Sequence, residues 1–240
     1  MRRPDLAIAL DLPSPAAALA LVDRLGDEVT WYKVGPVLGT AAGPDLVREL
    51  VGRGKSVFLD YKWHDIPNTA AGAVAAAASL GAALATVHLS GGRAMLEAAA
   101  SARGGKLRLV GVGVLTSLDG AGFGVVMGRE VSDVGWEQER LMQPGLGLLD
   151  GFVTAPGETA RIRGFAGPDA FLVTPGIRLS GGEGGDHRRS ATPGEAVQAG
   201  TDLLVVGRPI TEARDPAAVV QAIRIELQPR AQTGGSRPVA

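Results

Sequence analysis

The sequence predicts a single-domain (β/α)8 barrel, or TIM barrel, on three observations. The chain has 240 residues, a length that suits one α/β barrel. Short apolar runs that end in polar residues or glycine recur eight times along it. Segments with helical patterning separate these runs, and repeated strand–helix alternation is typical of a closed parallel barrel surrounded by helices.

The apolar runs are rich in valine, leucine and isoleucine, as expected for parallel strands that are buried on both faces. We therefore expect one strand in each run. We also expect the polar residues that follow the runs to gather at one end of the barrel. The runs occupy residues 6–11, 30–34, 56–60, 84–89, 107–115, 151–154, 170–174 and 202–206.

Helices between the strands are predicted from capping residues and from the positions of proline and glycine. Ser14 is an N-cap residue, Pro44 and Pro193 stand in first turns, and Gly81 ends a helical pattern. The helices expected from these signals, together with one inside a long irregular connection, cover residues 15–25, 44–52, 69–80, 136–142 and 192–199.

A doubly wound open sheet is the alternative architecture for the same alternation. The turn after the first run reads DLPS at residues 11–14 and holds no G-x-G-x-x-G, so a dinucleotide site is only weakly supported. We expect the barrel to cover residues 1–228. A flexible tail is expected over residues 229–240, which are polar and contain glycine and proline.

Composition excludes several classes of protein. Hydrophobic residues make up 45% of the chain and charged residues 20%, which excludes a disordered chain. The chain has no cysteine, so disulfides, thiolate metal sites and cysteine nucleophiles are impossible. A net charge of -1 gives no basic field for nucleic acid or an anionic membrane. Residues 66–92 lack charged side chains, but their alanine, glycine and proline favour a helix and a strand over a membrane span, so we expect a cytoplasmic protein.

Charged residues stand at the ends of the first three predicted strands, where barrel enzymes carry their catalytic groups. Asp11 ends the first run, Lys33 lies in the second, and the third continues into DYKWHD at residues 60–65. Asp60 and Lys62 are two residues apart, so on an extended chain they point to the same side. Asp65 follows the strand, where the loop turns it back or sends it to a neighbouring subunit. Alternate charges keep desolvated groups ionised.

Such a cluster suits the stabilisation of a carbanion. Opposite charges at about 4 Å attract by roughly 4 kcal/mol at an effective dielectric near 20, so neighbouring carboxylates favour the ammonium form of a lysine. An ammonium is a poor Schiff-base nucleophile but a good proton donor. A carboxylate beside the substrate repels an anionic group and favours its departure as CO2. The residues indicate a decarboxylation without an electron-sink cofactor, and they do not identify the substrate.

A phosphate site is predicted after the last two strands. The seventh run continues into VTPGIR at residues 173–178 and a glycine-rich stretch at 179–189, and the eighth is followed by Gly207 and Arg208. Loops at these places form the common phosphate site of this fold, and an arginine adds a bidentate contact. We expect residues 179–188 to be mobile and to close as a lid over bound phosphate.

The stretch LDYKWHDIPNT at residues 59–69 is similar to the signature of the orotidine 5′-phosphate decarboxylase family, which reads close to D-x-K-x-x-D-I-P-N-T. The resemblance implies a (β/α)8 barrel, a homodimer, and no metal or organic cofactor. It also implies conversion of orotidine 5′-monophosphate to uridine 5′-monophosphate and CO2, the last step of de novo pyrimidine biosynthesis. Further similar segments follow in order: ALD at 9–11, YKVG at 32–35, TVH at 86–88, LTS at 115–117, VTPGIR at 173–178 and VVGRPIT at 205–211.

The resemblance implies a role for each candidate residue. Lys62 would give a proton to C6 of the pyrimidine, Asp60 would oppose the substrate carboxylate, and Lys33 would be the bridging ammonium. Asp65 and Thr69 would reach the active site of a partner subunit. The other expected substrate contacts are Asp11 to the ribose, Ser117 to the base, Pro175 along the pyrimidine pocket, and Arg178, His187, Gly207 and Arg208 around the phosphate.

The chain departs from the family pattern at three places outside the charged cluster. His187 stands where glutamine is frequent, Leu89 where a small residue is usual, and Thr154 where serine is frequent. The first departure means that the contact which the family pattern implies at position 187, to the phosphate or within the lid, does not transfer directly to His187.

Two other functions stay open at this point. A magnesium-dependent sugar-phosphate decarboxylase or synthase of the same superfamily shares D-x-K-x-x-D. It typically carries a glutamate on the second strand, where this chain has Lys33, which would repel a cation. A non-catalytic phosphate-binding barrel is the other alternative, and the intact cluster of Asp60, Lys62 and Asp65 speaks against it.

Overall fold

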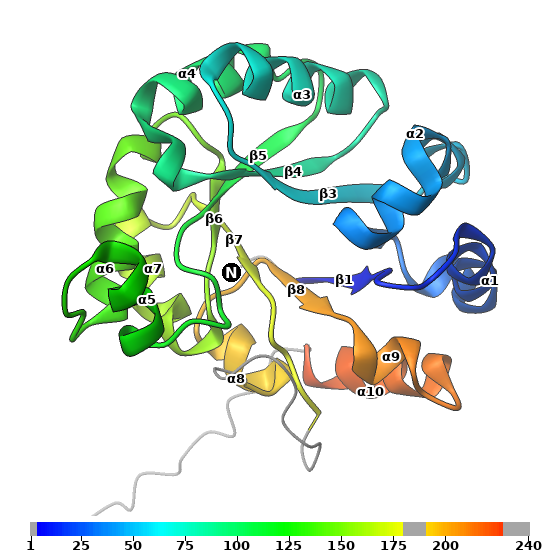
Figure 1. Cartoon of the computed structure of the whole chain (residues 1–240). Helices are drawn as coiled ribbons and strands as arrows, with labels where there is room; N and C mark the ends of the chain where they lie inside the picture. Colours follow the sequence, from blue (N-terminus) through cyan, green and yellow to red (C-terminus); the bar gives the residue numbers. More distant parts are fainter. Residues whose placement is uncertain (1–3, 180–190, 228–240) are drawn as a thin grey trace, which may run out of the picture.

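The computed structural model describes residues 4–179 and 191–227. Within these ranges, eight strands form a closed barrel in chain order, so the predicted (β/α)8 architecture is confirmed (Figure 1). All neighbouring strands pair in parallel, and β1 closes the barrel against β8. Each predicted apolar run holds one strand: β1 (Asp5–Ala9), β2 (Trp31–Val34), β3 (Ser56–Trp63), β4 (Leu84–His88), β5 (Arg108–Val112), β6 (Gly151–Val153), β7 (Phe171–Thr174) and β8 (Leu203–Val206).

Helices surround the barrel on its outside (Figure 1). The helices predicted after Ser14 and around Pro193 are confirmed. Ser14 accepts a backbone N–H as the predicted cap, and Thr192, predicted as a helical residue, caps α8. In the described ranges the helices are α1 (Pro15–Leu25), α2 (Pro36–Gly52), α3 (Pro67–Ser79), α4 (Gly92–Ala102), α5 (Gly120–Met127), α6 (Val134–Met142), α7 (Thr159–Ala166), α8 (Pro193–Gln198), α9 (Arg208–Thr211) and α10 (Pro216–Glu226).

Helices α4, α5, α7, α9 and α10 lie outside the helical ranges predicted above, and α2 differs from its predicted range. The helix expected from Pro44 is only the second half of α2, because Gly43 adopts φ 62° and breaks the helix before Pro44 restarts it. Helix α5 was not predicted, since its sequence GAGFGVVM is rich in glycine, which disfavours helix in isolation. Asp119 caps α5 by accepting a hydrogen bond from the Gly122 N–H at 2.8 Å.

Two buried clusters form most of the core. The larger one lies between the strands and the helices and includes Ile8, Tyr32 and Leu204. The smaller one contains Ala9 and Phe58, which also line the cavity described below, so it fills the barrel interior beneath that cavity. The strands are therefore buried on both faces, which explains their continuous apolar sequences.

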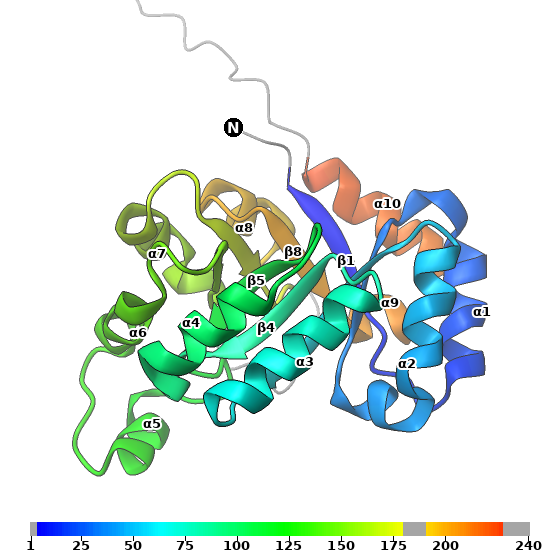
Figure 2. The same cartoon turned by 90° about the horizontal axis from the view of Figure 1, so that it is seen from above.

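The uncharged stretch at residues 66–92 folds as the sequence predicts. It forms α3, a turn at Gly81 with φ 80°, and β4, which pairs with β3 and β5. Helices α3 and α4 lie side by side along the outside of the barrel (Figure 2). Among the described helices, none is both long and apolar enough to cross a bilayer.

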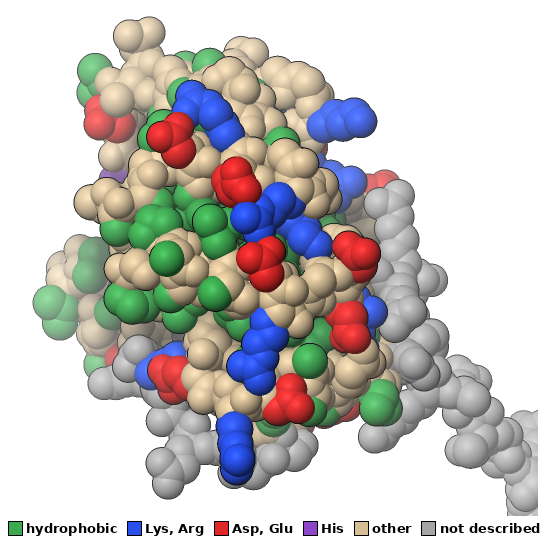
Figure 3. Space-filling model, turned by 90° about the vertical axis from the view of Figure 1, so that its right-hand side faces the viewer, with side chains coloured by type: hydrophobic (Ala, Val, Ile, Leu, Met, Phe, Trp, Pro, Cys, Tyr) green, Lys and Arg blue, Asp and Glu red, His purple; other side chains and the backbone are tan. Residues whose placement is uncertain are grey.

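The outer face formed by α1 and α2 mixes charges of both signs (Figure 3). On it, Arg53 donates to both Asp23 and Glu49, and Arg48 donates to Asp45. This face therefore carries no large field of one sign.

Several predictions fall on residues outside the described ranges. They are the boundary at residue 228, the tail at 229–240, and all but the start of the proposed lid, including His187.

Candidate active site

A cavity of about 730 Å³ opens at the carboxyl ends of the strands. This is the end at which TIM barrels carry their active sites, and the volume lies in the range of small-molecule pockets. Most of the predicted site residues line it: Asp11, Lys33, Asp60, Lys62, Ser117, Pro175, Arg178, Gly207 and Arg208.

Four charged side chains form an alternating row along one wall of the cavity. Lys33 Nζ lies 3.2 Å from Asp11 Oδ1 and 3.6 Å from Asp60 Oδ2. Lys62 Nζ donates to Asp60 Oδ1 at 2.9 Å. The side chains of Lys33 and Asp60 are only 10% and 15% exposed, so the middle of the row is largely desolvated, whereas Lys62 and Asp11 at its ends are 35% and 53% exposed. The predicted charge cluster is thus assembled by residues from three consecutive strands.

Lys62 reaches Asp60 by a different route from the one expected. It has φ 50°, in the left-handed region that side chains other than glycine rarely adopt. The pairing of β3 with β4 shifts register between Leu59 and Trp63, so the strand is bulged around Lys62. Simple alternation along an extended strand therefore does not explain the contact. The strained backbone turns the ammonium toward Asp60, and such strain is often found at functional sites.

Thr86 of β4 joins the row, although the sequence assigned it no role. Its hydroxyl accepts a hydrogen bond from the Lys62 backbone N–H at 2.8 Å and donates to Asp60 Oδ1 at 3.2 Å. Thr86 is fully buried, so this one hydroxyl supports both the bulge and the carboxylate. Its polar side chain inside the apolar run LATVH was at most a weak signal, because threonine is also common in strands.

Burial alone would raise the pKa of the Asp60 carboxyl. The charges of Lys62 and Lys33, with hydrogen bonds from Lys62 and Thr86, outweigh it and lower the pKa below its ordinary value. Asp60 is therefore held as an anion facing the cavity. If Asp60 left the row, Lys62 would lose its carboxylate partner, while Lys33 would keep Asp11.

Gly35 leaves the room that this row needs. It is the N-cap of α2, directly after β2. A Cβ at this position would lie 3.0 Å from Asp11 Oδ1 and 3.1 Å from Lys33 Nζ. A side chain here would therefore push against the ion pair.

The predicted phosphate residues line the cavity from β7 and β8. Pro175, Gly176 and Arg178 follow β7, and Gly207 and Arg208 follow β8. Gly207 is the N-cap of the short helix α9, which begins at Arg208. Thr211 and Glu212 of this region also line the cavity and were not predicted.

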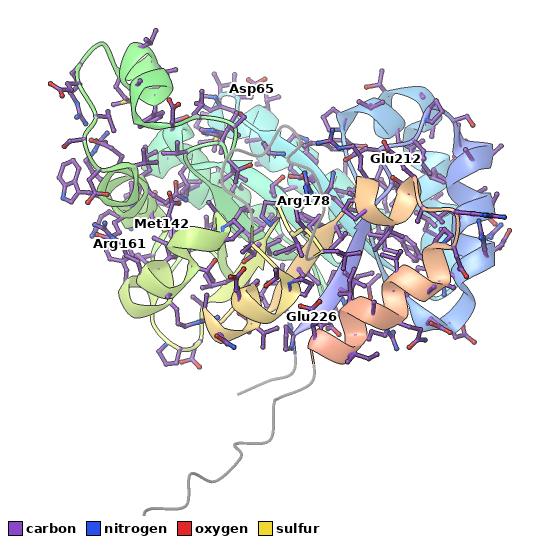
Figure 4. All side chains as sticks on the ribbon, turned by 90° about the horizontal axis from the view of Figure 1, so that it is seen from below. Asp65, Met142, Arg161, Arg178, Glu212 and Glu226 are labelled. Atoms are coloured by element: carbon purple, nitrogen blue, oxygen red, sulfur yellow. The ribbon has the colours of Figure 1, made fainter. Side chains whose placement is uncertain are left out.

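Asp65 and Thr69 do not line this cavity. Asp65 lies after the end of β3, where its carboxylate accepts a hydrogen bond from the Ile66 N–H at 2.7 Å. Both residues are exposed, as is Ile66 between them. Figure 4 shows Asp65 toward one end of the barrel and Glu226 toward the opposite end. Asp65 is therefore at the cavity's end of the molecule but outside the cavity of its own chain.

Among the described residues, no group of three or more histidine or acidic side chains is arranged to hold a metal ion. His64 and His88 are neighbours, with ring centroids 5.2 Å apart, and Ser90 Oγ lies 2.6 Å from His88 Nδ1.

Known proteins resemble this chain over almost its whole length. A sequence profile of the orotidine 5′-phosphate decarboxylase / HUMPS family matches residues 4–223. An orotidine 5′-phosphate decarboxylase from Methylobacterium radiotolerans is 46% identical over 230 residues, which cover 94% of this chain and 96% of that protein. One from Halorhodospira halophila is 48% identical over 231 residues, or 93% of this chain and 96% of its own.

The fold comparison agrees with these relatives. The crystal structure of orotidine 5′-phosphate decarboxylase from Lactobacillus acidophilus has a TM-score of 0.83 to this structure at 32% identity, covering 95% of this chain and all of the other. Barrel, charged row and sequence similarity agree, and the resemblance expected from the D-x-K-x-x-D segment is confirmed. The chain belongs to the orotidine 5′-phosphate decarboxylase / HUMPS family.

Proposed function

We propose that this protein decarboxylates orotidine 5′-monophosphate to uridine 5′-monophosphate and CO2, the closing step of pyrimidine nucleotide synthesis. The names of its relatives support the substrate. The observation that carries the chemistry is the alternating row in which Asp60 lies between the ammonium groups of Lys33 and Lys62 at the cavity wall.

The proposed step uses no group besides these side chains. The bond between C6 of the pyrimidine and its carboxylate breaks, CO2 leaves, and the electron pair stays on C6. The ammonium of Lys62 stabilises this negative charge and then transfers its proton to C6. Lys62 regains a proton from solvent, so the net change is the exchange of CO2 for a proton.

Asp60 contributes by being an anion that cannot move away. Lys33, Lys62 and Thr86 hold its carboxylate in place. A substrate carboxylate placed beside it is repelled in the ground state, and this repulsion falls as CO2 forms. The same carboxylate keeps Lys62 oriented toward the cavity. Such electrostatic preorganisation costs no rearrangement during the reaction.

The rest of the cavity gives the nucleotide one orientation. We infer that Gly207 and Arg208 bind the phosphate, because arginine binds phosphate with paired hydrogen bonds and backbone N–H groups at a helix start favour anions. Arg178 and, outside the described residues, His187 complete that end. Ser117 then contacts the base, Pro175 lines the pyrimidine pocket, and Asp11 contacts the ribose. Binding energy at the phosphate thus positions C6 near Lys62.

We further propose a homodimer in which Asp65 and Thr69 complete the site of the partner subunit. Both residues are exposed and lie outside their own chain's cavity, although Asp65 is only three residues from Lys62. The exposed side chain of Ile66 between them is 66% accessible, as an interface residue would be before assembly.

The decisive assay is the loss of orotidylate absorbance with purified protein and excess chelator. The proposal expects rapid conversion that the chelator leaves unchanged, with stoichiometric release of CO2. Turnover that the chelator abolishes would favour the magnesium-dependent alternative. Absence of turnover together with tight phosphate binding would favour the non-catalytic barrel.

The shared site has its own test. Lys62→Ala and Asp65→Ala homodimers are each expected to be inactive. Mixing and reassembling them should restore about a quarter of wild-type activity, because a mixed dimer then holds one intact site. Activity that stays absent after verified subunit exchange would place Asp65 in its own chain's site, and an active Asp65→Ala homodimer would place it in no site.

A further inference from the structure

The ladder between β5 and β6 is short, as is the one between β7 and β8. Only two residue pairs form the ladder between β5 and β6, Val110 with Gly151 and Gly111 with Phe152. Beyond them, toward the cavity, the side chain of Gln138 from α6 lies between the two strands. Its Oε1 accepts a hydrogen bond from the Val114 N–H at 2.7 Å, and its Nε2 donates to the Val153 carbonyl at 3.2 Å. The side-chain amide thus bridges the two strands at a position where a direct backbone hydrogen bond would otherwise continue the ladder.

This amide is buried and tightly enclosed. Gln138 is only 1% exposed, and a buried amide is costly unless its donor and acceptor are both used. A Cβ on Gly113 would lie 2.3 Å from Gln138 Oε1, so glycine is required there for the amide to enter. The burial of Gln138 and the absence of a side chain at Gly113 therefore both support this contact.

The helix that carries Gln138 is itself fixed. Glu137 is nearly fully buried and accepts from both Arg129 and Arg140. Asp133 caps α6 at the Trp136 N–H and also pairs with Arg161 of α7 at 2.9 Å. Helix α6 is thus tied to α7 and to the connection that follows α5, in the group of helices at the left of Figure 1.

We propose that Gln138 is a positioning residue that holds the end of β5 apart from β6 and so fixes the segment that meets the pyrimidine base. This inference rests on the proposed function. The residues beside the amide line the cavity: Val114, Leu115, Thr116 and Ser117 after β5, Val153 at the end of β6, and Ala155 after it. The proposed phosphate residues follow β7 and β8, and the hydrogen bonds of Gln138 within the described part of the chain go to Val114 and Val153 instead.

This separation predicts a selective defect. Gln138→Met keeps the length of the side chain but removes its donor and acceptor, so Val114 and Val153 lose their shared partner. Affinity for uridine 5′-monophosphate should fall about tenfold or more, and KM for the substrate should rise with it. Affinity for ribose 5-phosphate, which lacks the base, should stay within about twofold. Calorimetric titration measures both ligands.

A matched control is Gln221→Met, which removes an exposed amide on α10 and should change neither affinity. Equal losses for both ligands in Gln138→Met would indicate a general structural defect and overturn the proposal, as would unchanged affinities. If Gln138→Met does not fold, Gln138→Asn keeps the amide but shortens its reach, and the same selective loss is expected.

Hydrogen exchange separates this inference from the proposed function because it needs no ligand. In Gln138→Met, or in Gln138→Asn, amides of residues 113–117 should exchange faster, while those of residues 171–178 should keep their wild-type rates. Unchanged exchange at residues 113–117 would overturn the inference even if the wild-type enzyme decarboxylates its substrate. Absence of wild-type turnover with the expected exchange would overturn the proposed function alone.

Discussion

Aspartates paired with arginine or lysine side chains occur at both ends of the barrel. They differ in whether their carboxylates bind backbone N–H groups or border the cavity. At the amino end, Asp150 precedes β6 and Asp202 precedes β8. Asp202 accepts from Arg163 at 2.6 Å and from the backbone N–H of Leu172 at 2.8 Å. Asp150 repeats this arrangement, with the Leu109 N–H and an arginine as its donors. Each carboxylate thus joins an arginine to a neighbouring strand.

At the carboxyl end, Asp60 has only side-chain donors, and it borders the cavity. Its partners, Lys33 and Lys62, keep polar hydrogens that a ligand can use. We expect an ion pair at a barrel end to stabilise the fold where a backbone N–H also binds its carboxylate. We expect an ion pair to take part in chemistry where a cavity leaves its ammonium groups accessible to a ligand. Each prediction below tests one side of this contrast.

The largest effect is expected for Lys62→Ala. Loss of the proton donor should lower kcat by about 10⁴-fold, the upper range for general acid catalysis. Binding of uridine 5′-monophosphate should be largely intact, because the proposed phosphate contacts follow other strands. Steady-state assays and calorimetry measure the two quantities. Near-normal turnover would show that Lys62 is not the proton donor. It would also contradict a catalytic function for the ion pairs at the carboxyl end of the barrel.

A smaller loss is expected for Arg208→Ala, at the phosphate side of the same cavity. Removing a charged hydrogen-bond donor should lower kcat/KM by about 100-fold. Thermal stability should change little, because the side chain borders the cavity rather than the core. Unchanged kinetics would show that the phosphate binds elsewhere.

At the opposite end, Asp202→Ala should affect stability and not catalysis. The change removes the side-chain acceptor of the Leu172 N–H and the carboxylate partner of Arg163, whose guanidinium keeps the Gly200 and Ala170 carbonyls as acceptors, and it should cost about 2 kcal/mol in the free energy of unfolding. Urea unfolding measures this loss, and kcat of the folded enzyme should equal that of wild type. Asp45→Ala is the control. It breaks an exposed pair with Arg48 and should cost under about 0.5 kcal/mol. A large fall in kcat for Asp202→Ala would contradict the division between the ends.

The contrast also explains how much could be predicted from the sequence. Buried parallel strands are continuous apolar runs, so all eight could be located. Lysine and aspartate inside or just after such runs are rare unless paired, which made Lys33 and Asp60 visible as site residues. The family resemblance then added roles that the charges alone did not supply.

Other features depend on contacts between distant segments. The left-handed conformation of Lys62 results from a bulge against β4, and no local residue pattern encodes it. Gln138 lies on a predicted helix, but its role depends on where β5 and β6 separate. Thr86 looked like an ordinary β-branched strand residue. Such residues become recognisable only when the hydrogen-bond partners of buried polar groups are known.

The smallest effect concerns His88, beside the cavity end. Burial, the neighbouring His64 and the charge of Lys62 lower the pKa of His88 below its ordinary 6.5. As pH falls through 6.5, the unfolded chain takes up a proton that the folded chain does not. The contribution of this group to stability is therefore complete above 6.5 and declines as pH falls toward the lower folded-state pKa.

Urea unfolding of wild type and His88→Asn at about pH 7.5 and about pH 5.5 isolates this term. Wild type should lose more stability on acidification than the variant, by under about 1 kcal/mol, because His88 is only half-buried and solvent screens its neighbours. The Nδ1 atom of the neutral His88 ring accepts a hydrogen bond from the Ser90 N–H. A proton on Nδ1 would point at the Ser90 amide hydrogen, so this hydrogen bond would be lost. Equal losses in both proteins would mean that this contact does not couple to protonation.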